Sequence, residues 1–187
     1  MLFRSRSGGA DLGLWQWSRN GILFEDGSEE TDLLLLEDGQ EEPVVVAGGS
    51  GNQSQGQFSH DGKWLAYASD ENGETEVYVR GYQSTGTPIL ISGAGSDMPR
   101  WRADDGELFF RRSDGWLMSV AIDQAAGDIF RHEPPVPLFP GIPGLINALG
   151  TINYQPSRDG QRFLVGRPAG TKPPIIVLLN WLEAIGR

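Results

Sequence analysis

The sequence contains no cysteine. Disulfides, thiolate metal sites and a cysteine nucleophile are therefore excluded, although a cysteine-free chain can function on either side of a membrane. Histidine is nearly absent as well, because the only two are His60 and His132. His60 lies inside a predicted turn and His132 close to two prolines, so we interpret both as solvated loop residues. A Ser-His-Asp triad or a histidine-based zinc site has little to build on.

Basic residues are scarce, with 15 Lys and Arg against 25 Asp and Glu and a net charge of -10. Phosphate binding needs clustered basic residues, so we expect no nucleic acid partner. We interpret the acidity as an aid to solubility; the alternative is steering of a cationic partner. No apolar run reaches the ~18 residues of a membrane span, and the first residues lack the apolar region of a signal peptide. We expect no membrane insertion by this segment.

The motifs of common enzyme classes are missing too. The sequence has no Gly-rich phosphate loop, no His-Arg-Asp or Asp-Phe-Gly motif and no Gly-x-Ser-x-Gly elbow, which argues against kinase and hydrolase chemistry in this chain. Adjacent carboxylates such as Glu41-Glu42 point apart on a strand or turn and do not suit a glycosidase. We expect no catalytic residue and no cofactor, and we interpret the chain as a non-enzyme.

What the sequence does contain is turn signals between short apolar runs. The best unit is residues 57–80, QFSHDGKWLAYASDENGETEVYVR. An aromatic lead-in precedes a tight turn at 59–62, an alternating run, a second turn at 70–73 and another alternating run. Asp-Gly and Asn-Gly favour tight turns because both residues tolerate positive φ. No amphipathic helix of ordinary length is present, so the pattern predicts an all-β chain.

The unit recurs. Its turn glycines, Gly21, Gly62, Gly106 and Gly160, are separated by 41, 44 and 54 residues, and the longest interval contains a Pro-rich insertion. A period of about 40–45 residues with four strands per repeat predicts β-propeller blades. We predict antiparallel four-stranded blades at residues 1–47, 55–92, 98–139 and 150–181. The predicted blades include a short strand at 2–6 and an edge strand at 136–139; residues 48–56 are predicted to be a connector.

One blade cannot bury both its faces, so neighbouring blades must cover them. We expect the aromatic lead-ins Trp17, Phe58, Trp101 and Tyr154 to fill the space between blades. The Ser-x-Asp-Gly element is best interpreted as turn chemistry, since an Asp or Asn oxygen accepts nearby backbone N–H groups and Gly supplies the left-handed angle. Calcium would need several carboxylates within about a dozen residues, so we expect no metal site. The predicted structural turn residues are Ser18, Asn20, Gly21, Ser59, Asp61, Gly62, Asp104, Gly106, Ser157, Asp159 and Gly160.

The turns WSRNG, FSHDGKWLAY and SRDGQRFLV carry a family resemblance. The chain resembles the TolB-like, WD-repeat-like β-propellers of bacteria, whose hallmark is a Ser-Pro-Asp-Gly turn. The usual Pro is replaced by Arg19, His60 and Arg158, and the third turn, WRADDG, lacks the Ser and has an extra residue. Residues 56–122 and the ending VLLNWL are most similar to the C-terminal propeller halves attached to bacterial membrane-anchored serine/threonine protein kinases.

This resemblance implies a non-catalytic module that binds a protein or small ligand, commonly outside the cytoplasm, as the sensor or interaction part of a larger bacterial protein. Similar propellers precede the catalytic domain of prolyl-oligopeptidase-like hydrolases, so a substrate-gating propeller segment is the alternative. Candidate contact residues are Tyr82, Trp116 and the apolar loop 140–149, although Trp116 fits inter-blade packing equally well.

Related propellers usually have six or more blades, and this chain has about four. It is either a partial ring of a larger propeller or a small closed ring. The start of the chain inside a predicted strand favours a piece of a longer protein, and its last residues, 182–187, are predicted to form a helical turn. A partial ring would expose two blade faces and several strand edges, so we expect self-association through them.

Overall fold

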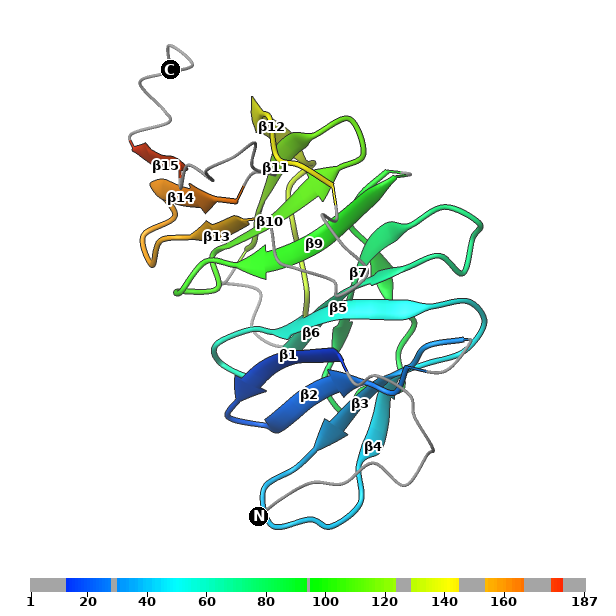
Figure 1. The fold of residues 1–187 in the computed structure, drawn as a ribbon. Coiled ribbons are helices and arrows are strands. Elements are labelled where there is room, and N and C mark those ends of the chain that lie inside the picture. The colour runs from blue at the N-terminus through cyan, green and yellow to red at the C-terminus, as the bar shows by residue number, and fades with distance from the viewer. Residues whose placement is uncertain are drawn as a thin grey trace, which may run out of the picture.

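The computed structural model describes residues 13–27, 30–93, 95–123, 129–144, 154–166 and, for the backbone, 176–179. All the regular structure in these residues is β, arranged as four antiparallel sheets that fan out from β1–β4 to β13–β15 (Figure 1). Three of the sheets have four strands and the last has three. The predicted all-β propeller architecture is confirmed, and the sheets form an arc of blades.

Within each sheet the strands follow one another in chain order, each antiparallel to the next. The first sheet contains β1 (Gly13–Ser18), β2 (Gly21–Glu25), β3 (Leu33–Leu36) and β4 (Val44–Ala47). The second contains β5 (Gln53–Phe58), β6 (Trp64–Ser69), β7 (Glu76–Gly81) and β8 (Ile89–Leu90). The third contains β9 (Ser96–Trp101), β10 (Glu107–Arg112), β11 (Trp116–Ala121) and β12 (Val136–Pro140), and the fourth β13 (Tyr154–Pro156), β14 (Arg162–Val165) and β15 (Ile176–Leu179).

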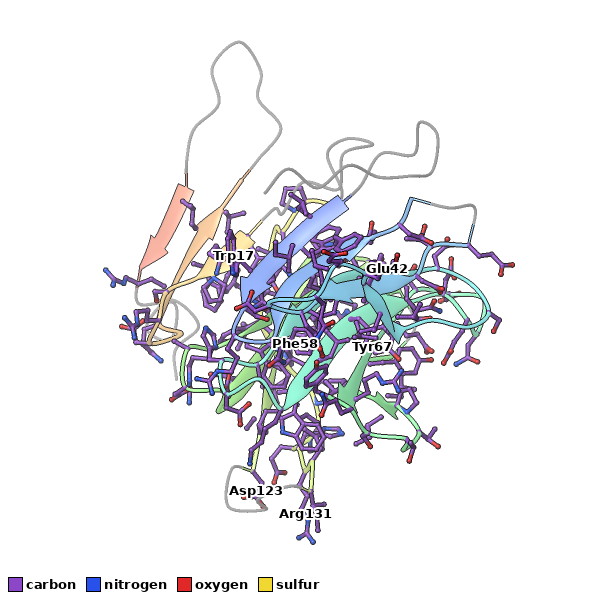
Figure 2. All side chains as sticks on the ribbon, turned by 90° about the horizontal axis from the view of Figure 1, so that it is seen from below. Trp17, Glu42, Phe58, Tyr67, Asp123 and Arg131 are labelled. Carbon is purple, nitrogen blue, oxygen red and sulfur yellow. The ribbon has the colours of Figure 1, made fainter. Side chains whose placement is uncertain are left out.

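The core consists of layers between consecutive sheets. Alternation along β6 places Leu65 and Tyr67 against the first sheet and Ala66 against the third. The corresponding face of β10, which carries Leu108 and Phe110, packs against the second sheet, while Phe109 packs against the fourth. Each inner sheet is therefore apolar on both faces, and its two faces are buried by its neighbours. Figure 2 shows Phe58 and Tyr67 in the packed centre of the molecule.

The segment 48–56 is not simply a connector, as the sequence predicted, because β5 begins at Gln53. The strand is polar and contains a β-bulge between Ser54 and Gln57, where Gln55 has a φ of 58°. The innermost strand of the third sheet is irregular at the same place, since Met98, 43 residues later, has a φ of 56°. Bulged polar strands lack the apolar alternation on which the strand prediction rests.

A second expectation is wrong for Trp17. Phe58, Trp101 and Tyr154 are buried between sheets, but the side chain of Trp17 is 78% exposed. No described sheet covers the face of the first sheet on which it lies. The predicted strand at 2–6, the loop residues 145–149 and the helical turn at 182–187 lie outside the described residues.

Candidate functional site

The second turn of the predicted motif is a closed hydrogen-bonded unit. The Ser59 hydroxyl donates to Asp61 Oδ1 at 2.7 Å and accepts the backbone N–H of Trp64 at 3.0 Å. Asp61 Oδ1 also accepts the N–H of Lys63 at 3.0 Å, and Gly62 has a left-handed φ of 77°. The side chains of Ser59 and Asp61 thus bond within the turn and link β5 to β6.

The fourth turn repeats these contacts. Ser157 donates to Asp159, whose Oδ1 accepts the N–H of Gln161 at 3.0 Å, and the N–H of Arg162 donates to the Ser157 hydroxyl at 3.0 Å. The hydrogen bond from Ser157 lowers the pKa of Asp159, with a smaller contribution from the Gln161 N–H. Gly160 again has a left-handed φ, of 70°.

The first and third turns bind the second sheet instead. Asn20 does not accept a local N–H but donates its amide to the Gly62 carbonyl at 2.8 Å. In the third turn Asp104 is bound by the side chain of Arg102 at 2.6 Å, while Asp105 accepts the backbone N–H groups of His60 and Asp61 at 2.7 and 2.9 Å. The side chains of Asn20 and Asp105 thus bind backbone groups of the second turn, and these bonds join three neighbouring blades at one end of the inner strands.

The turn carboxylates accordingly face their own backbone or the adjacent turn and do not converge on a common point. In the part of the chain that the structure describes, no group of three or more His, Cys, Asp or Glu residues could hold a metal ion. His60 Nδ1 lies 3.0 Å from Asp105 and 47% of its side chain is exposed. This geometry provides no described nucleophile–base pair for covalent catalysis.

Sequence reasoning missed the residues that join the inner strands. Gln16 receives the N–H of Phe58 at 2.7 Å and donates to the Phe58 carbonyl at 3.2 Å. Gln57, at the equivalent position of the next repeat, receives the N–H of Trp101 at 2.8 Å. The sequence signal that could have revealed these contacts is a glutamine two residues before each motif serine.

In the third sheet this position is Arg100, which is buried with 3% of its surface exposed. Its Nη1 donates to the Pro99 carbonyl at 2.6 Å, and its Nη2 has no hydrogen-bond partner. Nearby Asp97 is instead held by Arg111 through two bonds of 2.7 and 2.6 Å. Burial lowers the pKa of Arg100, an effect that the charges of Tyr154 and Asp97 oppose.

One candidate binding feature is a groove of about 390 Å³ between the outer strand of the first sheet and the connector after β7. Tyr82 stands at its base, with its ring edge against Phe58 at a centroid distance of 5.2 Å and its hydroxyl donating to Glu37. Val44 and Val45 of β4 form the opposite side and are 49% and 58% exposed. The groove is lined by Glu37, Val44, Val45, Val46, Leu65, Arg80, Gly81, Tyr82, Gln83 and Ser84.

Strand β4 differs from the outer strands of the second and third sheets. The outer strand β8 has only two residues, and β12 contains Pro137 and Pro140, which lack the N–H needed for pairing. Strand β4 has four residues, VVVA, with no proline, and one of its edges pairs with β3. Its other edge can therefore accept another strand.

The remaining sequence candidates lie elsewhere. Tyr82 belongs to the groove, but Trp116 is partly buried and packs against the core layer between the second and third sheets. At the start of the 140–149 loop, Ile142 is buried in the layer between the third and fourth sheets. No helix that could cross a bilayer occurs in the part of the chain that the structure describes.

The arc of blades has clear counterparts among solved structures. TolB from Acinetobacter baumannii matches 88% of this chain and 40% of its own length, with a TM-score of 0.61 and 16% sequence identity. The fold is that of a TolB-like β-propeller. A TolB candidate from Agrobacterium tumefaciens matches 72% of this chain and 52% of its own length, with a TM-score of 0.52 and 14% identity. This TolB-like chain thus spans about half or less of the structures it matches.

A candidate 6-phosphogluconolactonase from Bacteroides uniformis has a TM-score of 0.42 and 16% identity over 83% of this chain and 49% of its own, which is too weak a similarity to carry an argument. No protein-family model and no curated protein sequence matches the TolB-like chain. The structural matches therefore establish its fold, and its function has to be argued from its own surface.

Proposed function

We propose that this TolB-like chain is a non-catalytic interaction module that binds an extended segment of a partner protein along strand β4. The observation that carries the proposal is the edge of β4 that pairs with no described strand, with its exposed valines Val44 and Val45, beside the groove at Tyr82. An exposed sheet edge binds a peptide through its backbone hydrogen bonds, and an adjoining pocket reads alternate side chains.

The groove chemistry defines the kind of segment that fits. Leu65, Val46 and the ring of Tyr82 offer apolar contact, while Glu37 and Arg80 add one charge of each sign. Glu41 and Glu42 are exposed immediately before β4, and the chain has a net charge of -10. A β-forming segment with an apolar anchor and flanking basic residues would be both attracted and bound.

The resemblance to kinase-attached propellers suggests the role of this chain within a larger protein. It supports an extracytoplasmic sensor or interaction module within a larger bacterial protein. The neighbouring reading frame tests this: a kinase domain and membrane span upstream would support it, and a hydrolase domain downstream would favour a gating propeller instead.

The binding proposal can be tested by selecting displayed random peptides on the purified chain and measuring their affinity by calorimetry. We expect extended, basic and apolar peptides whose affinity falls roughly tenfold or more in Val45→Glu and Tyr82→Ala. Leu90→Glu places the same charge on an exposed residue of β8 and should leave affinity unchanged. Peptides that bind all the variants equally, or that the chain hydrolyses, would contradict the proposal.

A further inference from the structure

The face of the first sheet that points away from the second sheet is apolar, and no described sheet covers it. Leu14 and Trp17 on β1 are 74% and 78% exposed. They border a groove of about 410 Å³ that also contains Ile22 and Leu36. We call this surface the first-sheet face. It lies on the opposite side of the sheet from the groove at Tyr82, since Leu23, Leu33 and Leu35 pack toward the second sheet.

Comparison with the equivalent face of the third sheet shows what kind of surface packs on the first-sheet face. Trp17 pairs with Ile22 across β1 and β2 as Trp101 pairs with Leu108 across β9 and β10. Leu36 pairs with Ile22 as Val120 pairs with Leu108. Trp101, Leu108 and Val120 are buried against the second sheet. The first-sheet face is therefore the equivalent of a surface that, in the third sheet, two repeats later, is covered by a blade.

The fourth sheet has the matching covering surface. Phe163 pairs with Pro156 in the fourth sheet as Leu65 pairs with Phe58 in the second. Leu164 is therefore the equivalent of Ala66, and Ala66 packs against the third sheet. Leu164 is 46% exposed. The apolar residue that would contact a following blade is thus present and lies at the surface.

Polar contacts between blades are repeated in the same way. Gln155 is the equivalent of Gln16 and Gln57, which bond to the backbone of the following inner strand at Phe58 and Trp101. Gln155 is exposed, and its side chain makes no hydrogen bond with any described residue. By the same pattern, Gln155 would bond to the backbone of the residue equivalent to Phe58 in a following blade. In the first sheet that residue is Trp17.

The turns add a third correspondence. The side chains of Arg19 and Arg102 lie over Gly62 and Gly160, the turn glycines of the following sheets. Arg158 holds the turn position of Arg19 in the fourth sheet and is exposed. The fourth sheet therefore presents an apolar, a hydrogen-bonding and a cationic residue in the arrangement that other blades use to bind their successor.

We propose that the fourth sheet of one molecule packs on the first-sheet face of a second copy of this chain. The two surfaces lie at opposite ends of the fan (Figure 1), and Trp17 stays exposed within one molecule, so the contact forms between molecules. Because the two surfaces differ, the interface is heterologous, and it produces a ring where the rotation closes and an open stack where it does not. The contact continues the blade-to-blade interface of the arc.

Sedimentation velocity of the purified chain over an about hundredfold concentration range tests the proposal. The mass should rise above the 20.4 kDa of one chain as the concentration increases. Trp17→Glu should weaken association roughly thirtyfold, as loss of a buried tryptophan anchor does. Gln155→Ala should weaken it by up to about tenfold through one lost hydrogen bond. Leu90→Glu, which introduces the same negative charge on an exposed residue of β8, should have no effect.

Mixing two variants separates this interface from any other. Trp17→Glu removes the accepting surface and Leu164→Glu the covering surface, and both residues are exposed enough for folding to survive. Each variant alone should remain monomeric, whereas the mixture should form a dimer that grows no further. A chain that stays monomeric at every concentration would overturn the proposal. So would association that survives both substitutions, or a mixture that forms no dimer.

Discussion

At the residue scale, Arg100 shows how one substitution in a repeat changes its energetics. In the second sheet the equivalent residue is Gln57, which accepts the N–H of Trp101 in the third sheet. In the fourth sheet the equivalent of Trp101 is Pro156, which has no N–H to donate to a residue at position 100. A glutamine would lose its main bond there. Arginine, which can only donate, occupies the site with one nitrogen unpaired.

We predict that Arg100→Met stabilises the protein by about 1–3 kcal/mol, because a buried cation whose Nη2 lacks a partner is replaced by an apolar chain of similar length. Urea unfolding followed by tryptophan fluorescence measures the effect. Arg112→Met is the control, since that arginine pairs with Asp114 at the surface and should leave the midpoint unchanged. A loss of stability in Arg100→Met would mean that the guanidinium has a partner in the folded chain.

At the element scale, side-chain hydrogen bonds between blades join the inner strands in addition to apolar packing. This explains why they were the least predictable elements. Gln53 and Gln55 are buried in β5, yet their polarity indicated a connector. The partners of Gln55, which are Glu25 and Met98, belong to other repeats, so no local pattern reveals them. The outer strands and turns were predictable because their signals, apolar runs and Asp-Gly or Asn-Gly pairs, are local.

Gln57→Ala should destabilise the protein by about 1–3 kcal/mol, because the N–H of Trp101 would be left without an acceptor in a buried layer. Gln155→Ala is the matched control at the equivalent position of the fourth sheet, where the side chain is exposed. Measured at low concentration, where association is minimal, the control should unfold like the parent chain. Equal effects of the two substitutions would rule out the proposed role of the inner-strand glutamines.

Asp70 fixes the start of β5 and gives the fold a pH dependence. Its carboxylate accepts the backbone N–H of Asn52 at 2.6 Å and the Asn52 amide at 2.8 Å, and these bonds lower its pKa. The stabilisation is complete above the ordinary value of 3.8 and is lost as the pH falls through the lower folded-state value.

Urea midpoints measured between neutral and acid pH should therefore fall less in Asp70→Asn than in the parent chain. Asp38→Asn, which alters an exposed carboxyl in the turn before β4, should reproduce the parent's pH profile. If Asp70→Asn and the parent lost stability in parallel down to pH values below 3.8, Asp70 would not anchor β5 through its charge.

At the scale of the whole molecule, the repeat period was enough to predict the TolB-like fold, since each blade repeats one turn and one alternation. The period could not show which surfaces stay free. Trp17 has the sequence of a buried lead-in and is exposed only because no described blade lies beside it. Likewise Tyr82 was a candidate from sequence, but its groove exists only where β4 meets the connector after β7.

The central claim is that this propeller chain binds an extended segment of a partner protein at β4 and does not catalyse a reaction on it. The most direct measurement is amide hydrogen exchange of the chain with and without a selected peptide. The account predicts slower exchange at Val44–Ala47 and in the adjoining residues 80–84, together with an intact peptide. Protection confined to other surfaces, such as the inner strands or the first-sheet face, or cleavage of the peptide, would contradict it.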